Sequence, residues 1–389
     1  MQHRRIIQNV AFLIVLVYQA APLYAQEGEI RIPLTSAYWD AEPERVAFIT
    51  HRSMPAARGA DGSAQLFLKD VHFSDGTIAF DVELNDRGFV GINFRESEDR
   101  SESEHFYIRA FWPVSPQSRT TLQYATVVDS MSLWDLTDDY QAAATITREG
   151  WNHVKLVISG KQMVVYVNDL TKPALHVPIL EGVRDSGRIS LSGNAIFANM
   201  VIRPGATEGL PAMAGYDPTI NDPRYLRDWL VSEPRDFPIE RNLVLDVPRM
   251  IGSPLISDLP DSSARWTPIE AEHRALVNLS RPFGAPIGKS RRLVWLKTTL
   301  TSDTIQQRRL DLGFSDEVWV FINGRLLHVD TNYYGLPGMK EPRGRCTIEN
   351  TSVMLPLQVG ENEVMIALAN SFYGWGIIAR LDDTVALSF

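Results

Sequence analysis

The sequence predicts an all-β protein in which two β-sandwich domains of the jelly-roll type stand in tandem after a signal peptide. Three observations predict this fold. Segments with apolar residues at every second position recur along the chain, turn-forming Gly, Asn and Pro separate them at short intervals, and long amphipathic helical patterns are nearly absent. Strands that follow one another at such regular spacing are typical of a sandwich or a barrel.

The start of the chain has the pattern of a secretory signal peptide. A basic region at 3–5 precedes an apolar run at 10–17, and Ala25 offers a small-residue cleavage site before Gln26. The apolar run is far shorter than the roughly 20 residues that span a membrane. We therefore expect residues 1–25 to be removed, and the mature protein to be soluble, periplasmic or extracellular, with no membrane span.

The balance of charge restricts the partners. The chain has 47 acidic and 38 basic residues and a formal net charge of −9 at pH 7. An acidic surface repels phosphate backbones, so we expect no nucleic acid partner. Strongly anionic polysaccharides are disfavoured for the same reason, unless a local basic patch overrides the mean charge.

The sequence gives no support for a bound cofactor. Its eight histidines are scattered without the close spacing of a zinc site, and there is no Gly-rich phosphate-binding loop. Cys346 is the single cysteine and cannot form an internal disulfide, so we expect a half-buried small residue rather than a reactive thiol. We predict no metal and no other cofactor.

The first predicted domain covers residues 26–203. Its segments alternate between polar and apolar residues, the pattern of a half-buried strand. Gly160 lies in a tight hairpin turn between two apolar runs. The predicted strands are 77–84, 89–95, 104–110, 154–158, 163–167, 187–191 and 198–202.

Alternation assigns the side chains of these strands to an inner and an outer face. If the first three strands are neighbours, their outward polar side chains share one sheet face, where we expect a sugar ligand. Arg and carboxylate groups hydrogen-bond to hydroxyls, and an aromatic ring packs on a pyranose. The alternative is a solvated face with cross-strand ion pairs such as Asp81–Arg95 or Glu83–Arg109. The predicted ligand-binding residues are Asp81, Asn93, Arg95, Tyr107, Arg109, Gln123 and Trp134, with Glu83 and His105 on the same face.

The same face raises the question of catalysis. Asp81 and Glu83 lie two residues apart on one strand, which separates their carboxylates by about 7 Å, between the values of retaining and inverting glycosidases. Nearby Arg95 and Arg109 would lower the pKa of a carboxyl group, the wrong direction for a general acid, and His105 offers an alternative base. Glu83 and His105 are therefore the catalytic candidates if the chain is a glycoside hydrolase or lyase.

An acidic run lies between two of the predicted strands. Residues 96–104 carry five acidic side chains, separated by Ser and Arg rather than by apolar residues. The spacing of an EF-hand calcium loop is missing. We therefore expect a solvated acidic loop at the mouth of the site.

Short motifs of the first domain occur in a characteristic order. They are FSDGTI at 73–78, GINFR at 91–95, GWNHVKL at 150–156, YVN at 166–168, GRI at 187–189 and FAN at 197–199. In this order they resemble the concanavalin A-like lectin/glucanase jelly roll, and within it the branch that includes the 3-keto-disaccharide hydrolase domains. The resemblance implies a carbohydrate ligand on the sheet face, while most of the motif residues are structural.

A second domain is predicted at 226–389, after a linker at 204–225 that is rich in Pro and Gly. Asn323-Gly324 between two apolar runs is a strong signal for a tight hairpin. Residues 225–231 are either one short helix or the start of a strand. Further strands are predicted at 293–300, 307–313, 317–327, 353–357 and 360–368.

The second domain also carries motifs that suggest a family. They are LGFSD at 312–316, VFING at 320–324 and LQVGEN at 357–362. This half is similar to the galactose-binding-like jelly roll found beside the catalytic barrel of family 2 glycoside hydrolases. In that family the catalytic carboxylates lie on the barrel, so the resemblance assigns no catalytic residue here.

Two aromatic loop segments of the second domain are candidate ligand contacts. Loop aromatics stack on sugar rings at the rim of a sandwich. The alternative is that Phe372 and Trp375 fill the end of the core. The small basic spot at Arg343 and Arg345 is too short to indicate a site. The candidate contacts are Tyr333, Tyr334, Tyr373 and Trp375.

Three functions follow from these patterns. The first is an exported carbohydrate-binding accessory protein that acts on an oligo- or polysaccharide in the cell envelope or outside it. The second is a glycoside-cleaving enzyme of the 3-keto-disaccharide hydrolase type, and the third is a structural module that packs against other envelope proteins. A closed pocket with carboxylate, His and Arg would favour the enzyme. An open groove with aromatic rings would favour binding, and a flat apolar patch would favour assembly.

Overall fold

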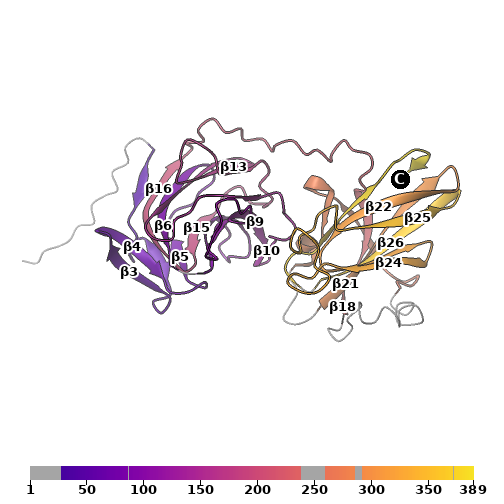
Figure 1. Cartoon of the computed structure of the whole chain (residues 1–389), viewed down its shortest axis with the longest axis horizontal. Coiled ribbons are helices and arrows are strands. Elements are labelled where there is room, and N and C mark those ends of the chain that lie inside the picture. Colours follow the sequence, from indigo (N-terminus) through magenta and orange to yellow (C-terminus); the bar gives the residue numbers. More distant parts are fainter. Residues whose placement is uncertain (1–27, 86, 238–258, 285–290, 371) are drawn as a thin grey trace, which may run out of the picture.

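A computed structural model of the chain describes residues 28–85, 87–237, 259–284, 291–370 and 372–389 (Figure 1). The predicted signal peptide at 1–25 lies outside these residues. The described part is built almost wholly from β-strands, which form two sandwiches, as the alternating pattern predicts. None of its helices has the length and apolar character needed to cross a bilayer.

The first sandwich contains two sheets of eight strands each. Sheet A has the order β14-β13-β12-β6-β16-β4-β3, with β1 also paired to β16. Its strands are β1 (Ile30–Ile32), β3 (Val46–His51), β4 (Met54–Gly59), β6 (Gly76–Leu84), β12 (Asn152–Ser159), β13 (Gln162–Val167), β14 (Leu175–Val177) and β16 (Ala195–Pro204).

Sheet B packs against sheet A and has the order β10-β9-β8-β7-β15-β5-β2, with β11 also paired to β9. Apolar side chains from both sheets form one core, in which Phe80, Phe94, Phe106 and Phe197 are fully buried. The strands of sheet B are β2 (Trp39–Ala41), β5 (Gln65–Leu68), β7 (Phe89–Glu96), β8 (Ser103–Arg109), β9 (Leu122–Val128), β10 (Met131–Ser132), β11 (Gln141–Ala142) and β15 (Arg188–Ser192).

The second sandwich contains sheet C, in the order β19-β17-β21-β26-β23-β24 with β18 and β28 on β21, and sheet D, in the order β20-β27-β22-β25. Residues 225–231 enter a strand, not a helix. Sheet C contains β17 (Asp228–Ser232), β18 (Arg235–Phe237), β19 (Trp266–Glu270), β21 (Arg291–Ser302), β23 (Glu317–Ile322), β24 (Arg325–Thr331), β26 (Gly360–Asn370) and β28 (Leu387–Ser388), and sheet D contains β20 (Leu276–Asn278), β22 (Gln306–Phe314), β25 (Thr351–Leu357) and β27 (Gly376–Leu381).

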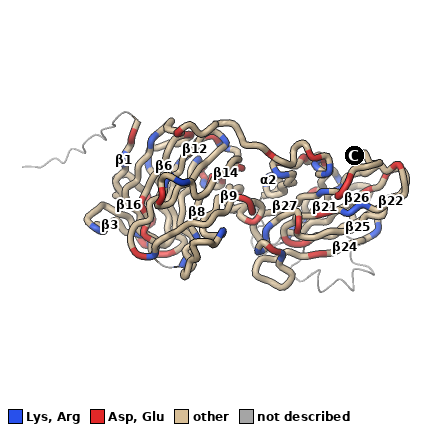
Figure 2. Tube along the Cα trace, turned by 45° about the horizontal axis from the view of Figure 1, so that its top comes forward, with Lys and Arg blue, Asp and Glu red and all other residues tan. Residues whose placement is uncertain are grey.

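Local sequence explains the predicted hairpin of sheet C. Asn323 and Gly324 join β23 to β24, and both have a positive φ, of 48° and 76°. Positive φ at both central residues is what a two-residue type I′ turn needs, and Asn-Gly adopts it at the lowest cost. The described residues also form two helices of one turn each, η1 (His273–Ala275) and α2 (Ser280–Phe283). Figure 2 shows Lys and Arg interspersed with Asp and Glu along both sandwiches.

The two sandwiches meet through the segment that follows β9 (Figure 1). Leu133 and Leu136 of this segment are buried in the core of the second sandwich. Asp135, between them, accepts hydrogen bonds from Gly374 N to its Oδ1 at 3.0 Å and from Cys346 N to its main-chain oxygen at 2.8 Å. The sandwiches therefore share buried contacts, which fix the geometry of any site between them. Cys346 is fully buried here and is not disulfide-bonded.

Candidate functional site

The sheet topology divides the predicted site between two surfaces. Strand β6 lies in sheet A between β12 and β16, whereas β7 and β8 lie in sheet B. Asp81 and Glu83 of β6 thus point away from the core on one side of the sandwich, and the outward residues of β7 and β8 point away on the other. The prediction of one shared polar face is wrong for these two residues, because alternation separates inside from outside but does not say which sheet a strand joins.

The carboxylates on sheet A are already paired. His153 Nδ1 lies 2.6 Å from Asp81 Oδ1, and Arg52 Nε donates to Glu83 Oε2 at 2.8 Å. His51 Nε2 lies 3.0 Å from the same Glu83 oxygen. The hydrogen bond from Arg52 lowers the pKa of Glu83 to about 2. Ionised, paired carboxylates of this kind do not serve as general acids.

The pKa of Asp81 is lowered as well. Burial raises it, but hydrogen bonds from His153 and Asn199 outweigh that effect. The ion pairs Asp81–Arg95 and Glu83–Arg109, named as examples of the alternative, do not form, because the sandwich core separates the two residues of each pair. Glu83 and His105 lie on different sheets with the core between them, so the predicted catalytic pair cannot act together on one glycosidic bond.

Arg95 is a structural residue rather than a ligand contact. Its side chain is 1% exposed, and its Nη2 donates to Asp75 Oδ1 at 2.8 Å and to Gly160 O at 2.9 Å. The cause is local: Arg95 has a φ of 51°, and the pairing of β7 with β15 shifts register beside it. A bulge of this kind redirects a side chain out of the regular alternation. Arg95 therefore ties β7 to the β12–β13 hairpin.

The neighbouring polar residues of sheet B are also mostly buried. Asn93 is 8% exposed, and its Nδ2 donates to Ser190 Oγ at 3.1 Å. His105 Nε2 is buried and has no hydrogen-bond partner among the described residues, and burial lowers the pKa of this imidazole to about 4. His105 is thus neutral at ordinary pH and packs on the ring of Tyr107, with a centroid distance of 4.9 Å.

The acidic run is not wholly the solvated loop that we expect from sequence. Glu96 ends β7 with 5% exposure, and Glu104 lies in β8 with 1%. Tyr124 OH donates to Glu104 Oε2 at 2.6 Å, and Gly182 N donates to Glu104 Oε1 at 3.1 Å. Burial raises the pKa of Glu104 to about 7. The loop between the two strands is a turn closed by Ser97 N, which donates to Glu102 O at 2.8 Å.

Of the remaining predicted residues of the first sandwich, only Arg109 lines a cavity of about 510 Å³ that the second sandwich also lines, and we call this cavity the junction pocket. Tyr107, Gln123 and Trp134 are buried and are not among its lining residues. The charged lining residues of the pocket are three arginines, and no carboxylate is among its described lining residues. The first sandwich contributes the lining residues from Phe89 to Thr121, and the second contributes Tyr334, Arg343 and Arg345. The pocket is lined by Phe89, Arg109, Phe111, Pro113, Val114, Ser115, Ser118, Thr120, Thr121, Tyr334, Arg343 and Arg345.

Gln123 holds two of these arginines beneath the pocket. Its Oε1 accepts hydrogen bonds from Arg109 Nη2 and, at 3.3 Å, from Arg345 Nη2. Arg109 Nη1 donates to Thr120 O at 3.0 Å, and Arg109 Nη2 also donates to Tyr107 OH at 3.1 Å. Most of these acceptors are neutral. A fully buried glutamine side chain thus brings two guanidinium groups from different sandwiches together.

Burial lowers the pKa values of the two guanidinium groups. Burial, reinforced by the charge of Arg109, lowers the pKa of Arg345 to about 10. Burial also lowers the pKa of Arg109. Arg345 Nε lies 3.5 Å from Asp138 Oδ1, and Arg119 shares that carboxylate. The pocket therefore keeps an excess of positive charge.

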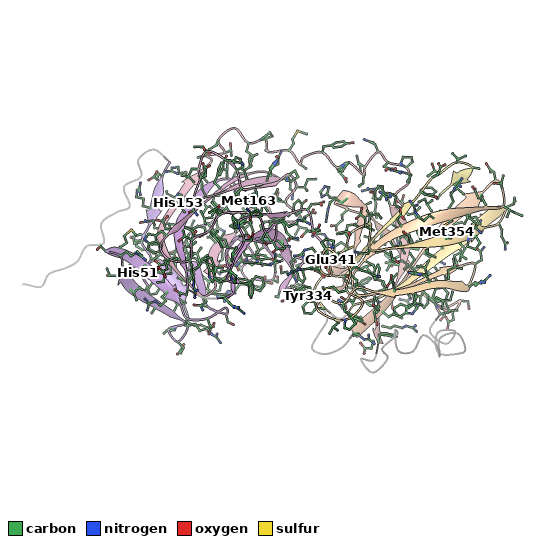
Figure 3. All side chains as sticks on the ribbon, viewed as in Figure 1. His51, His153, Met163, Tyr334, Glu341 and Met354 are labelled. Atoms are coloured by element: carbon green, nitrogen blue, oxygen red, sulfur yellow. The ribbon has the colours of Figure 1, made fainter. Side chains whose placement is uncertain are left out.

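Exposed aromatic rings surround the arginines. Phe89, Phe111 and Tyr334 are 49%, 46% and 47% exposed. Figure 3 shows Tyr334 at the end of the second sandwich nearest to the first. Its ring is parallel to that of Phe372 at 5.9 Å and meets the edge of Trp134 at 5.1 Å. Large apolar side chains gathered at a surface mark a site of interaction.

The second-sandwich candidates have different positions. Tyr334 lines the pocket, and Tyr373 packs on Trp134 with a centroid distance of 5.7 Å. Tyr333 OH instead accepts a hydrogen bond from Arg291 at 3.0 Å. Trp375 is fully buried, so its prediction as a ligand contact is wrong and the alternative of a core residue is right. Phe372, in contrast, is 39% exposed.

Sequence reasoning missed Arg343 and Arg345. They flank Gly344, which has a φ of 73° and lies against Tyr334, so the loop places both arginines on the pocket wall. Two arginines around a glycine in an aromatic-rich loop were the available signal. This pattern indicates a site only in combination with Arg109, which comes from a distant part of the chain.

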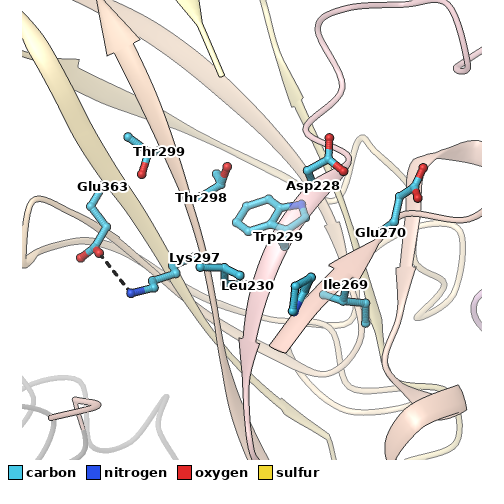
Figure 4. A pocket seen from close by; sticks show the side chains of 10 residues that line it. Asp228, Trp229, Leu230, Ile269, Glu270, Lys297, Thr298, Thr299 and Glu363 are labelled. Carbon is cyan, nitrogen blue, oxygen red and sulfur yellow. Dashed lines mark ion pairs between the residues drawn. The ribbon is translucent and has the colours of Figure 1, made fainter. Parts of the chain in front are cut away.

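A larger cavity, of about 670 Å³, lies on sheet C (Figure 4). Lys297 there pairs with Glu363 at 3.8 Å, and the remaining charged lining residues are Asp228 and Glu270. Its single aromatic lining residue, Trp229, is 3% exposed and donates its indole N–H to Leu226 O. This cavity thus has no exposed ring for a sugar, so the junction pocket is the better candidate. Within the described ranges, no three His, Cys, Asp or Glu side chains are grouped as metal ligands would be.

No protein-family model matches the chain, and no curated protein matches it by sequence. Solved structures are similar in fold. A carbohydrate binding module, CBM66, from Bacillus subtilis has 15% identity, covers 42% of this chain and 94% of its own, and has a TM-score of 0.33. A putative glycosyl hydrolase from Parabacteroides distasonis has 14% identity, with coverages of 45% and 98% and a TM-score of 0.33. The β-glucanase of Bacillus licheniformis has 8% identity, with coverages of 46% and 99% and a TM-score of 0.32.

Proposed function

We propose that the chain is an exported carbohydrate-binding protein that holds a glycan in the junction pocket. The observation that carries this proposal is the meeting of guanidinium donors and exposed aromatic rings in one cavity of about 510 Å³. A cavity of this volume is in the range of small-molecule sites. The export rests on the signal pattern of residues 1–25, and the glycan would lie in the envelope or outside the cell.

The chemistry of the lining suits a sugar. The apolar face of a pyranose packs on an aromatic ring, and Phe89, Phe111 and Tyr334 offer such rings. Sugar hydroxyls accept hydrogen bonds from Arg109 and Arg343, and the hydroxyls of Ser118 and Thr120 both donate and accept. Arginine held by buried partners is ordered before the ligand arrives, which reduces the entropy cost of binding.

Binding rather than cleavage is the activity that this pocket favours. Glycoside hydrolysis requires a general acid and a base or nucleophile beside the scissile bond. Among the lining residues in the described part of the chain there is neither a carboxylate nor a histidine. The enzyme alternative therefore has less support than binding. A protein partner for the exposed rings remains an outcome of the test.

The test is a glycan array probed with residues 26–389, followed by calorimetry on the hits. We expect a hit whose affinity falls about tenfold in Tyr334→Ala, since one stacked ring contributes about 0.5–1.5 kcal/mol. The matched control is Tyr216→Ala, because Tyr216 is 73% exposed and lies away from the pocket lining. Chemical unfolding of both variants should match the wild type.

Two results would contradict the proposal. An array without a hit would direct the search to envelope proteins as partners. A hit that binds Tyr334→Ala as tightly as the wild type would place the glycan elsewhere. Chromatography of the bound glycan should show intact saccharide, and shortened products would favour the enzyme alternative.

A further inference from the structure

We infer that the glycan is anionic: the junction pocket is built to bind a sugar that carries an oxyanion, a carboxylate or a sulfate, between Arg109, Arg343 and Arg345. This inference rests on the proposed function and names the class of its ligand. It is carried by the position of three guanidinium groups in one cavity, with no acidic side chain among the lining residues that the structure describes.

The nearby acids neutralise these arginines only in part. Asp138 is shared, because Arg119 Nη1 donates to its Oδ2 at 3.1 Å while Arg345 Nε lies 3.5 Å from its Oδ1. Asp135 is buried, and burial raises the pKa of its carboxyl group to about 7, so it is ionised only in part near neutral pH. The charge of at least one guanidinium group therefore remains available to a ligand.

Arg343 is the group best placed to meet that ligand. It is exposed, and none of the described residues accepts a hydrogen bond from its guanidinium group. Arg109 and Arg345, in contrast, are held by Gln123 from below. This arrangement suits a ligand that enters from solvent, meets the fixed guanidinium groups of Arg109 and Arg345, and is then bound by the free group of Arg343.

The residue type supports an oxyanion in particular. The planar guanidinium fork donates two parallel hydrogen bonds to a carboxylate or a sulfate, and these charge-assisted bonds are stronger than bonds to a hydroxyl. A neutral sugar would leave the mutually repelling charges of Arg109 and Arg345 only partly compensated. An oxyanion would stabilise the charged form of all three arginines.

The position of this charge is also informative. The chain has a net charge of −9, and both signs are dispersed over its surface (Figure 2). Three arginines in a cavity whose described lining residues include no acid concentrate a positive field there, and low-dielectric walls focus such a field on a bound anion. A local basic patch of this kind is the condition under which an acidic protein binds an anionic polysaccharide.

The experiment compares an anionic oligosaccharide with its methyl ester, in which the carboxylate charges are removed. Calorimetry is run with oligogalacturonate trisaccharide and with its fully methyl-esterified form, and a sulfated galactan oligosaccharide is the third probe. We expect the free acid to bind at least about tenfold more tightly than the ester, because charge-assisted hydrogen bonds are lost in the ester. Raising the salt from about 50 mM to about 500 mM should weaken binding of the acid and leave the ester unchanged.

Arg343→Gln tests the assignment to the pocket. It should reduce affinity for the anionic probe about tenfold, and affinity for the ester much less. Arg325→Gln is the matched control, since Arg325 is exposed at the opposite end of β24 from the loop that carries Tyr334. Both variants should unfold as the wild type does, because neither side chain is buried.

The outcomes separate this inference from the proposed function. Equal binding of acid and ester, with both lost in Tyr334→Ala, overturns the inference and leaves glycan binding in place. Binding of the sulfated probe alone, weakened in Arg343→Gln, supports the inference and identifies sulfate as the oxyanion. If neither the anionic probes nor the neutral glycans of the array bind, the proposed function is overturned together with the inference.

Discussion

The two outer faces of the first sandwich carry similar side chains and use them differently. On sheet A, Asp81 and Glu83 are paired with His153 and Arg52. On sheet B, Arg109 projects from β8 into the junction pocket, where the second sandwich adds two further arginines. Charge is compensated on the first face and accumulated on the second.

The difference shows which features indicate a site. Charged residues on a sheet face are common and are usually compensated by neighbours, as Glu83 is. The junction pocket differs because its charge lacks acidic partners in the lining and because Phe89 and Phe111 are exposed beside it. Uncompensated charge next to exposed apolar surface is costly for the free protein, and a ligand removes that cost.

The largest effect should come from a residue that belongs to neither face. Arg95→Ala removes the buried guanidinium group that binds Asp75 and the main chain of Gly160. We expect the free energy of unfolding to fall by about 3 kcal/mol, because buried acceptors lose their donor. Urea unfolding measures this. Arg58→Ala, at an exposed position of β4, is the control and should change stability by less than about 0.5 kcal/mol. An Arg95→Ala protein of wild-type stability that fails to bind glycan would restore Arg95 as a ligand contact.

The strands and the two sandwiches could be predicted from the sequence, because both follow from local patterns. Alternation at 77–84 and the Asn-Gly turn at 323–324 each depend on a few consecutive residues. The partner of a strand depends on long-range packing, so the placement of β6 in sheet A could not be read from its alternation. Arg95 was misplaced because a bulge with positive φ interrupts the alternation.

The candidate site could be predicted only in part, for a related reason. Arg109, Gln123 and Tyr334 were each predicted as candidate ligand contacts, but they come from three segments of the chain that the fold brings together. Arg343 and Arg345 lie in a loop without periodicity, where sequence pattern gives no face. The meaning of a basic residue depends on which acids lie near it, and that is a property of the assembled junction.

The junction can be examined through the pH dependence of stability. Burial raises the pKa of Asp135 to about 7, from an ordinary value of 3.8. A carboxyl group with a raised pKa contributes stability below pH 4, and this contribution is lost as the pH rises through 7. Asp135→Asn keeps an oxygen for Gly374 N but does not titrate. Its unfolding free energy should therefore improve relative to the wild type by at least about 2 kcal/mol between pH 4 and pH 8.

The difference in unfolding free energy between Asp135→Asn and the wild type reports on the Asp135 carboxyl group alone. Glu104 has a pKa raised to about 7 by burial as well, and it titrates in both proteins, so it cancels in the difference. A difference that stays constant from pH 4 to pH 8 would mean that Asp135 is ionised throughout. The pocket arginines would then have a buried counter-charge, and the contrast between the two faces would be weaker.

The smallest effect is expected on sheet A, and it tests the contrast most directly. The pKa of Glu83 is lowered to about 2 by its hydrogen bond with Arg52, so its stabilising contribution is present above pH 4.5 and is lost as the pH falls towards 2. Because the pair lies at the surface, Glu83→Gln should cost about 1 kcal/mol at pH 7, and this deficit should shrink on acidification. Glycan affinity measured by calorimetry should equal that of the wild type, since Glu83 lies on the sheet that faces away from the junction pocket. Loss of binding in Glu83→Gln would move the site to sheet A and assign its paired carboxylates a role with the ligand.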